Sequence, residues 1–204
     1  MMPYSDFFTQ LGLFAVKDFF SAELCASLLQ EAREAAGVRG RIWKKGHSDL
    51  VVDEAVKRRT EVMFPEEMEL IVKSRLLSLM PELESHFNVA LTGCQIPKLV
   101  RYSKGDFYRT HVDISVLSDA PQQTKERQVA IVIFLNDEDD EPGHGSYCGG
   151  SLTFYGLVDD PRWNPFGLPL IGERGLLVAF PPNILHEVTP ITHGQRYTVT
   201  SWFF

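Results

Sequence analysis

From residue 94 onward the chain consists of short apolar segments separated by turn residues, and this pattern limits the possible folds more than any other feature. The segments are rich in β-branched and aromatic residues, which favour strands. They span residues 96–102, 129–135, 151–155, 175–180 and 196–203. Turn-forming residues such as Gly149-Gly150 and Pro181-Pro182 separate them. Short strands without helices between them predict an antiparallel sandwich or barrel.

The first part of the chain, about residues 1–93, predicts a cover of helices and early strands. Residues 13–16 form a short strand candidate, and Ser21 is a candidate N-cap of a helix that ends near Gly37. A second helix is predicted to begin after Pro65 and to continue past Pro81 to Phe87. We expect these helices to pack outside one sheet, so that residues 1–204 form a single, mostly β domain with a barrel core at about 94–204.

The overall charge of −7 disfavours a nucleic-acid partner, because such proteins usually carry a basic surface. The one basic concentration, Lys44 with Lys45 and residues 57–59, is expected to be a solvated surface. There is no signal-peptide pattern, and no apolar run approaches the ~20 residues that cross a bilayer. Three cysteines without a C-x-x-C pair suit a reducing compartment. We therefore expect a cytoplasmic protein without a membrane segment.

Four polar residues in the strand-rich part carry the candidate chemistry. His111 and Asp113 are two positions apart and would face the same side of a strand. His186 follows in a second segment, and Arg196 in a third. The His-x-Asp spacing alone is weak evidence, since a strand histidine is more often structural. Two imidazoles and one carboxylate nevertheless suit Fe(II) with open coordination positions, and an arginine provides a fork for a carboxylate ligand.

Four blocks within about residues 95–204 resemble the Fe(II)- and 2-oxoglutarate-dependent dioxygenases, specifically the prolyl 4-hydroxylase-like branch. Residues 101–113, RYSKGDFYRTHVD, are similar to that branch's R-Y-x-x-G-x-x-Y-x-x-H-x-D. Residues 129–136 resemble its strand that ends in L-N, and residues 149–154 resemble its G-G-x-L-x-F. The fourth block, residues 175–202, contains His186 and Gly194-Gln195-Arg196.

This resemblance implies a double-stranded β-helix, a cupin-like jelly-roll barrel whose mouth holds the iron. It implies His111, Asp113 and His186 as metal ligands. It also implies that Arg196 pairs with the distal carboxylate of 2-oxoglutarate, a position at which family members carry Lys or Arg.

Three further residues are candidates for contacts with the cosubstrate. The resemblance implies that the hydroxyl of Tyr102 donates to a carboxylate oxygen of 2-oxoglutarate. Tyr108 is a weaker candidate, and barrel packing is the alternative for both tyrosines. Thr198 lies on the same strand face as Arg196 and is a candidate contact for that reason.

The implied activity is hydroxylation of a C–H bond with Fe(II), 2-oxoglutarate and O2, with ascorbate as a candidate reductant. Asp113 favours hydroxylation, because halogenating relatives have a small residue at that position. The first hypothesis for the substrate is a prolyl residue in a peptide or protein. The alternative is a free amino acid or other small metabolite. A third hypothesis is a barrel that binds a metal or ligand without turnover.

The acidic insert at about residues 137–149 is expected to be a solvated loop, with a mobile lid or a patch for a basic peptide as the alternative. His144 and His193 have no partner at strand spacing and stay unassigned. The sequence predicts neither the oligomeric state nor the stereochemistry of the reaction.

Overall fold

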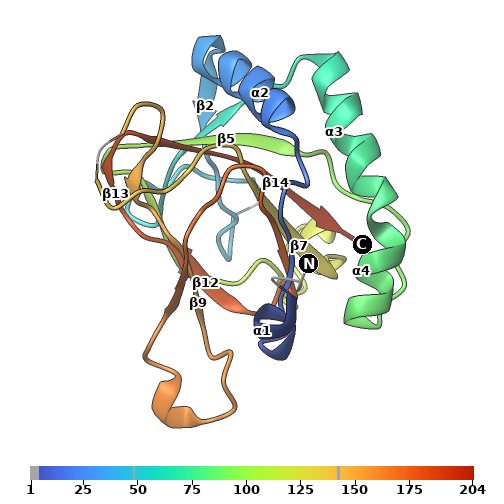
Figure 1. Ribbon diagram of the computed structural model, residues 1–204. Helices are drawn as coiled ribbons and strands as arrows, with labels where there is room; N and C mark the ends of the chain where they lie inside the picture. Colours follow the sequence, from blue (N-terminus) through green and yellow to red (C-terminus); the bar gives the residue numbers. More distant parts are fainter. Residues whose placement is uncertain (1–4, 48, 142) are drawn as a thin grey trace.

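Two antiparallel β-sheets form the body of the computed structural model, which describes residues 5–47, 49–141 and 143–204 (Figure 1). The seven-stranded sheet has the order β1 (Phe14–Val16), β11 (Leu177–Phe180), β7 (Val129–Phe134), β14 (Gln195–Phe203), β5 (Lys98–Ser103), β4 (Thr60–Val62) and β2 (Gly37–Arg39). The five-stranded sheet has the order β10 (Leu168–Leu170), β9 (Leu152–Tyr155), β12 (Leu185–Val188), β6 (Phe107–His111) and β3 (Lys57–Arg58). A two-stranded ladder pairs β8 (Cys148–Gly149) with β13 (Ile191–His193).

The central strands β11, β7 and β14 of the seven-stranded sheet are buried on both faces. In β7, Ile131 and Ile133 pack toward the helices, whereas Val132 and Phe134 pack toward the five-stranded sheet. Strands covered on both faces read as continuous apolar runs, which is why these segments were visible in the sequence. The mostly β fold with flanking helices is confirmed. Among the described residues no ladder of strands joins the two large sheets, so the jelly roll stays open rather than closing into a barrel.

The helices α2 (Ala22–Glu34), α3 (Glu66–Ser78) and α4 (Met80–Phe87) cover the outer face of the seven-stranded sheet, as predicted (Figure 1). Ser21 caps α2 by accepting from the backbone N–H of Leu24. The second predicted helix is divided at Leu79, and Pro81 lies in the first turn of α4, where its missing N–H is tolerated.

The remaining helices are short: α1 (Ser5–Gln10), α5 (Gln122–Lys125) and the 3₁₀ turn η1 (Pro161–Trp163). In the part of the chain that the structure describes, no helix combines the length and the apolar run needed to cross a membrane.

The early strands are integral to both sheets and do not merely cover them. β1 forms one edge of the seven-stranded sheet, β4 and β2 extend the other edge, and β3 forms an edge of the five-stranded sheet. β2, β3 and β4 have two or three residues each and, unlike β1, contain no apolar run, so they were not predicted.

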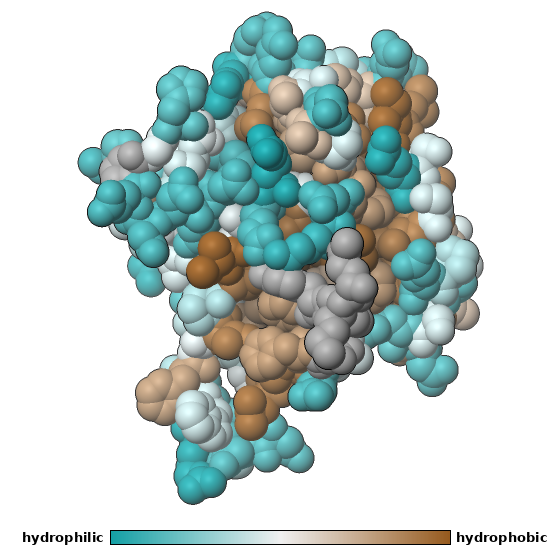
Figure 2. All heavy atoms as spheres, viewed as in Figure 1, coloured by the Kyte–Doolittle hydropathy of each residue, from teal (hydrophilic) through white to brown (hydrophobic). Residues whose placement is uncertain are grey.

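A loop at residues 156–167, between β9 and β10, projects from the body at the bottom of Figure 1. It exposes three apolar side chains, Val158, Trp163 and Phe166, and Figure 2 shows apolar surface on this lobe among hydrophilic residues.

Candidate metal and cosubstrate site

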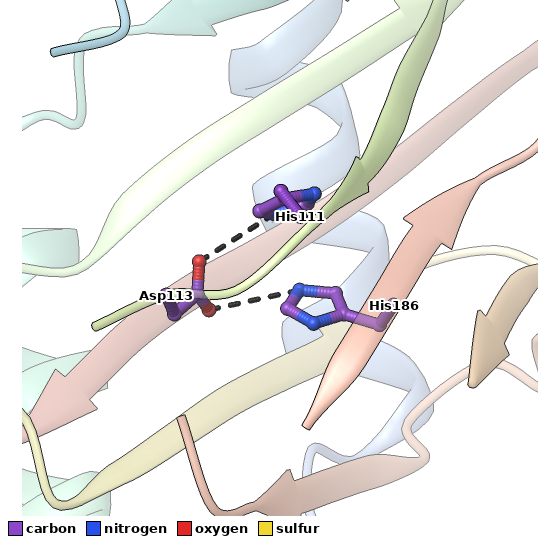
Figure 3. Close-up of side chains that lie close together, drawn as sticks. All are labelled: His111, Asp113 and His186. Atoms are coloured by element: carbon purple, nitrogen blue, oxygen red, sulfur yellow. Dashed lines mark ion pairs between the residues drawn. The ribbon is translucent and has the colours of Figure 1, made fainter. Parts of the chain in front are cut away.

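Three side chains from β6, from the segment after it and from the neighbouring strand β12 converge in the five-stranded sheet (Figure 3). His111 in β6 and His186 in β12 are register partners, and their ring centroids are 4.2 Å apart. Asp113 follows the end of β6, and its Oδ1 lies 3.5 Å from Nε2 of His111 while its Oδ2 lies 3.7 Å from Nε2 of His186. One ligand atom of each residue lies within 4.8 Å of the others. The structure thus brings together the three predicted metal ligands.

Backbone carbonyl groups fix the orientation of both imidazole rings. Nδ1 of His111 lies 2.8 Å from the carbonyl oxygen of Arg109, and Nδ1 of His186 lies 2.9 Å from that of Ile184. A carbonyl oxygen only accepts, so Nδ1 of each ring carries the proton and Nε2 presents its lone pair to the site. This is the arrangement in which a histidine binds a metal ion through Nε2.

The charge states of His186 and Asp113 also suit a divalent cation. Burial and the neighbouring His111 lower the pKa of His186 to about 4, so its ring is neutral near pH 7. Burial raises the pKa of Asp113, but His186, His111 and Arg127 outweigh it and hold that pKa well below its usual range. Metal ligands must be deprotonated, and His186 and Asp113 already meet this condition at neutral pH.

Two residues that the sequence analysis missed hold Asp113 in place. Trp202 donates from Nε1 to Oδ2 of Asp113 over 2.8 Å. Arg127 donates to the backbone carbonyl of Asp113 over 2.8 Å, and its guanidinium lies 3.8 Å from the centroid of the Trp202 ring. Trp202 shares a face of β14 with Arg196 and Thr198, so the alternation of that strand was a signal that it faces the site.

Arg196 is buried beside this site without an acidic partner. Its guanidinium lies 5.2 Å from the ring centroid of Tyr102 and 5.0 Å from that of Phe134. Among the described residues it makes no ion pair, and its Nε has no hydrogen-bond partner. The hydroxyl of Thr198 is also buried and unpartnered. Buried donors of this kind require a partner, and a carboxylate is the natural ligand of a guanidinium.

The two predicted tyrosines occupy different environments. The hydroxyl of Tyr102 accepts from Nη1 of Arg59 over 3.4 Å, which leaves its own proton free to donate into the cavity. The ring of Tyr108 stacks on His111 with centroids 3.5 Å apart, and burial raises its pKa above the usual value. Tyr102 is therefore placed to contact a carboxylate, whereas Tyr108 is placed to orient the ring of His111.

The three predicted metal ligands, Arg196, Thr198 and the two tyrosines line one cavity of about 380 Å³ between the two large sheets. Its wall also contains Lys57 and Arg59, which corrects the prediction that the basic stretch is a solvated surface. Both side chains are buried, because β3 pairs with β6 and β4 pairs with β5. Lys44 and Lys45 are exposed, as expected.

The acidic insert is tied to the sheet at Glu138, which accepts from Ser151 and from the backbone N–H of Gly172. Beyond this residue the insert is largely exposed. His144 and His193 lie outside the cluster of metal-capable residues found in the described chain.

A family model described as the 2OG-Fe(II) oxygenase superfamily matches residues 97–204. A PKHD-type hydroxylase of Teredinibacter turnerae is 33% identical over 107 residues, 52% of this chain and 41% of the relative. A PKHD-type hydroxylase of Klebsiella pneumoniae is 27% identical over 191 residues, 93% of this chain and 77% of the relative. The chain thus spans less than half of the first relative's length.

Two solved structures share the fold. A prolyl-4-hydroxylase of Pseudomonas putida superposes with a TM-score of 0.66 at 22% identity, over 94% of this chain and 91% of that one. A prolyl hydroxylase of Trichoplax adhaerens, solved with a peptide fragment of the hypoxia inducible factor, superposes with a TM-score of 0.68 at 20% identity, over 95% and 83% of the two chains. These likenesses confirm the double-stranded β-helix that the sequence predicted.

Proposed function

Because the chain belongs to the 2OG-Fe(II) oxygenase superfamily, we propose that it is an Fe(II)- and 2-oxoglutarate-dependent hydroxylase. One observation carries the proposal: the cluster of His111, Asp113 and His186 shares its cavity with Arg196, a buried cation that has no acidic partner among the described residues. A site that only held a structural metal would not need this cation.

Each residue receives a role in this proposal. His111, Asp113 and His186 hold the iron, and Arg196 pairs with the distal carboxylate of 2-oxoglutarate, assisted by the hydroxyl groups of Tyr102 and Thr198. Iron, 2-oxoglutarate and O2 together supply the oxidation of a C–H bond to C–OH, coupled to conversion of 2-oxoglutarate into succinate and CO2.

The protein supplies the fixed geometry around these groups. The backbone carbonyl groups of Arg109 and Ile184 orient the two imidazoles. Trp202 holds one oxygen of Asp113, and Tyr108 packs against His111. Burial of the site between two sheets excludes bulk water and leaves ordered groups facing the reacting centre.

For the substrate, the first candidate is a prolyl residue in a peptide or protein. The names of the relatives and of the solved structures support this candidate. The alternative is a free amino acid or other small metabolite, which the modest size of the cavity favours. The negative charge of the whole chain disfavours a nucleic-acid partner.

We place the activity in a single domain of residues 1–204, with about 94–204 as the catalytic core. The cysteines Cys25, Cys94 and Cys148 are free thiols, which supports a reducing compartment such as the cytoplasm.

The test is formation of succinate from 2-oxoglutarate with Fe(II), O2 and ascorbate, first without and then with peptide libraries and free amino acids. We expect a substrate to stimulate succinate formation and to gain one oxygen atom by mass spectrometry. His111→Ala should abolish both signals, whereas His144→Ala, an exposed histidine outside the cluster, should retain them. Binding of Mn(II) without any turnover would favour the non-catalytic alternative.

A further inference from the structure

The cavity around the proposed iron site is lined by cations far more than by anions. Asp113 is the single acidic residue among its described lining residues. The basic ones are Arg41, Lys57, Arg59, Lys98, Arg127 and Arg196. The chain as a whole carries a net charge of −7, so this concentration of positive charge is local. A cavity lined by charges of one sign attracts ligands of the opposite charge.

Two of these cations already have roles. Arg196 is assigned to the cosubstrate under the proposed function, and Arg127 is engaged with Asp113 and Trp202. Three others share one carboxylate, that of Glu61. Its oxygens lie 2.9 Å from Nη2 of Arg59, 3.0 Å from Nζ of Lys98 and 3.6 Å from Nζ of Lys57. We call Lys57, Arg59 and Lys98 the basic triad; when all three are protonated, they exceed the charge of Glu61 by two.

Two members of the basic triad, Lys57 and Arg59, lie close to the proposed metal ligands. Nζ of Lys57 is 4.8 Å from the centroid of the Tyr108 ring, and that ring stacks on His111. Nη1 of Arg59 donates to Tyr102, the proposed cosubstrate contact. One aromatic ring therefore separates the excess positive charge from the reacting centre.

Burial makes this concentration of positive charge costly. Lys57 and Arg59 are both about 95% buried, and Nε of Arg59 has no hydrogen-bond partner. Burial and the adjacent Arg59 lower the pKa of Lys57 well below its usual value, although Glu61 opposes this. Buried like charges of this kind are stabilised when an anion enters beside them.

We propose that the basic triad binds a carboxylate of the substrate, so that the hydroxylated carbon belongs to an acidic compound. The convergence of all three cations on Glu61 shows that their spacing suits a carboxylate. The carboxylate belongs either to a free acid or to an acidic residue beside the target residue of a peptide. This inference rests on the proposed function and names the chemistry of its substrate.

The experiment compares matched acid and amide probes. The free-acid arm uses L-proline against L-prolinamide, and the peptide arm uses acetylated prolyl peptides with Glu or Gln next to proline. Binding is measured by anaerobic calorimetry on the full chain loaded with Mn(II) and 2-oxoglutarate. We expect the acid of at least one pair to bind roughly tenfold or more tightly than its amide, with a preference that weakens as salt is added. Equal binding within every pair, or no binding by any acid, would overturn the proposal.

Variants of the basic triad then test which residues cause the preference for the acid probe. Lys57→Gln and Lys98→Gln should each reduce the acid-to-amide ratio about tenfold while leaving the affinity for 2-oxoglutarate within about twofold. Lys98 is partly exposed, so its variant keeps the test open if Lys57→Gln does not fold. The control is Lys104→Gln, an exposed lysine that does not line the cavity. Loss of 2-oxoglutarate binding with an unchanged acid-to-amide ratio would assign the triad to the cosubstrate and reject the proposal.

The two proposals fail in different ways. Succinate formed slowly without substrate reports on the oxygenase itself, and its absence in the wild-type protein would count against the proposed function. The binding experiment needs no turnover, so a missing acid preference would reject the role of the basic triad even in an active oxygenase.

Discussion

The indole N–H of Trp202 donates a hydrogen bond of 2.8 Å to Oδ2 of Asp113. Trp202 lies in β14 of the seven-stranded sheet, whereas His111 and His186 lie in β6 and β12 of the five-stranded sheet. Asp113 therefore connects the seven-stranded sheet, through Trp202, to the proposed metal site on the five-stranded sheet. A hydrogen bond from outside the ligand set orients a carboxylate and tunes its affinity for the metal.

We predict that Trp202→Phe weakens metal binding about tenfold or more, because it removes this donor while keeping an aromatic ring. Titration of the protein with Mn(II), followed by electron paramagnetic resonance, measures the change. Trp163→Phe is the control, since Trp163 lies in the exposed loop between β9 and β10. An unchanged dissociation constant for Mn(II) in Trp202→Phe would show that the hydrogen bond does not orient the ligand.

The strands and the candidate metal ligands could be predicted from the sequence because each follows from a local pattern of residues. β7 and β11 are buried on both faces and appear as unbroken apolar runs. His111 and Asp113 were identified because a strand places alternate residues on one face, and His186 and Arg196 were identified because they follow in two later strand segments; the family resemblance then implied the role of each residue. Trp202 was overlooked although it continues the alternation of Arg196 and Thr198 along β14.

The buried basic residues could not be predicted from their own segment. β3 has two residues and β4 has three, which is too short for any period to appear. Lys57 lies in β3, and Arg59 lies between β3 and β4. Both are buried because these strands pair with β6 and β5, which lie about 40–50 residues later in the chain. A run of like charges in a sequence also predicts a solvent-exposed surface unless a counterion such as Glu61 is known to lie beside it.

We predict that Arg196→Met raises the stability of the ligand-free protein and weakens binding of 2-oxoglutarate. The guanidinium is buried without an acidic partner among the described residues, so an apolar side chain of similar length should stabilise the fold by roughly 1–3 kcal/mol. The lost charge pair should cost about 2–5 kcal/mol of binding free energy. Urea unfolding and calorimetry with Mn(II) measure the two effects.

The matched control is Arg75→Met, on the exposed surface of α3, which should change neither quantity by more than about 0.5 kcal/mol. A destabilised Arg196→Met protein with normal affinity for 2-oxoglutarate would show that Arg196 has a structural role instead.

The N-cap of α2 gives a prediction about stability alone. Ser21→Ala removes the acceptor for the N–H of Leu24 and should cost about 1 kcal/mol. Ser27→Ala in the same helix should be neutral or stabilising, because the hydroxyl of Ser27 donates to the carbonyl of Glu23 within the helix. Thermal unfolding of both variants measures the difference. Equal effects would mean that the cap contributes no more than a surface serine.

Glu61 predicts how stability depends on pH. Burial raises the pKa of Glu61, but Arg59, Lys57 and Lys98 outweigh it and lower that pKa from 4.5 to about 2. A carboxyl group whose pKa is lowered by folding stabilises the protein above its unfolded pKa, and this contribution is lost as the pH falls toward the folded pKa. The contribution of Glu61 should therefore be complete above about pH 5 and should disappear between about pH 4.5 and pH 2.

We predict that Glu61→Gln lowers the free energy of unfolding at pH 7 by on the order of 3 kcal/mol, since the buried Lys57 and Arg59 then lose their counterion. The gap between wild type and variant should narrow steadily below pH 4.5 and close near pH 2. Urea unfolding across this range measures it. Glu54→Gln, which removes an exposed pair with Arg39, should cost less than about 1 kcal/mol at any pH. A gap for Glu61→Gln that stays constant down to pH 2 would mean that the side chain acts by packing and not by charge.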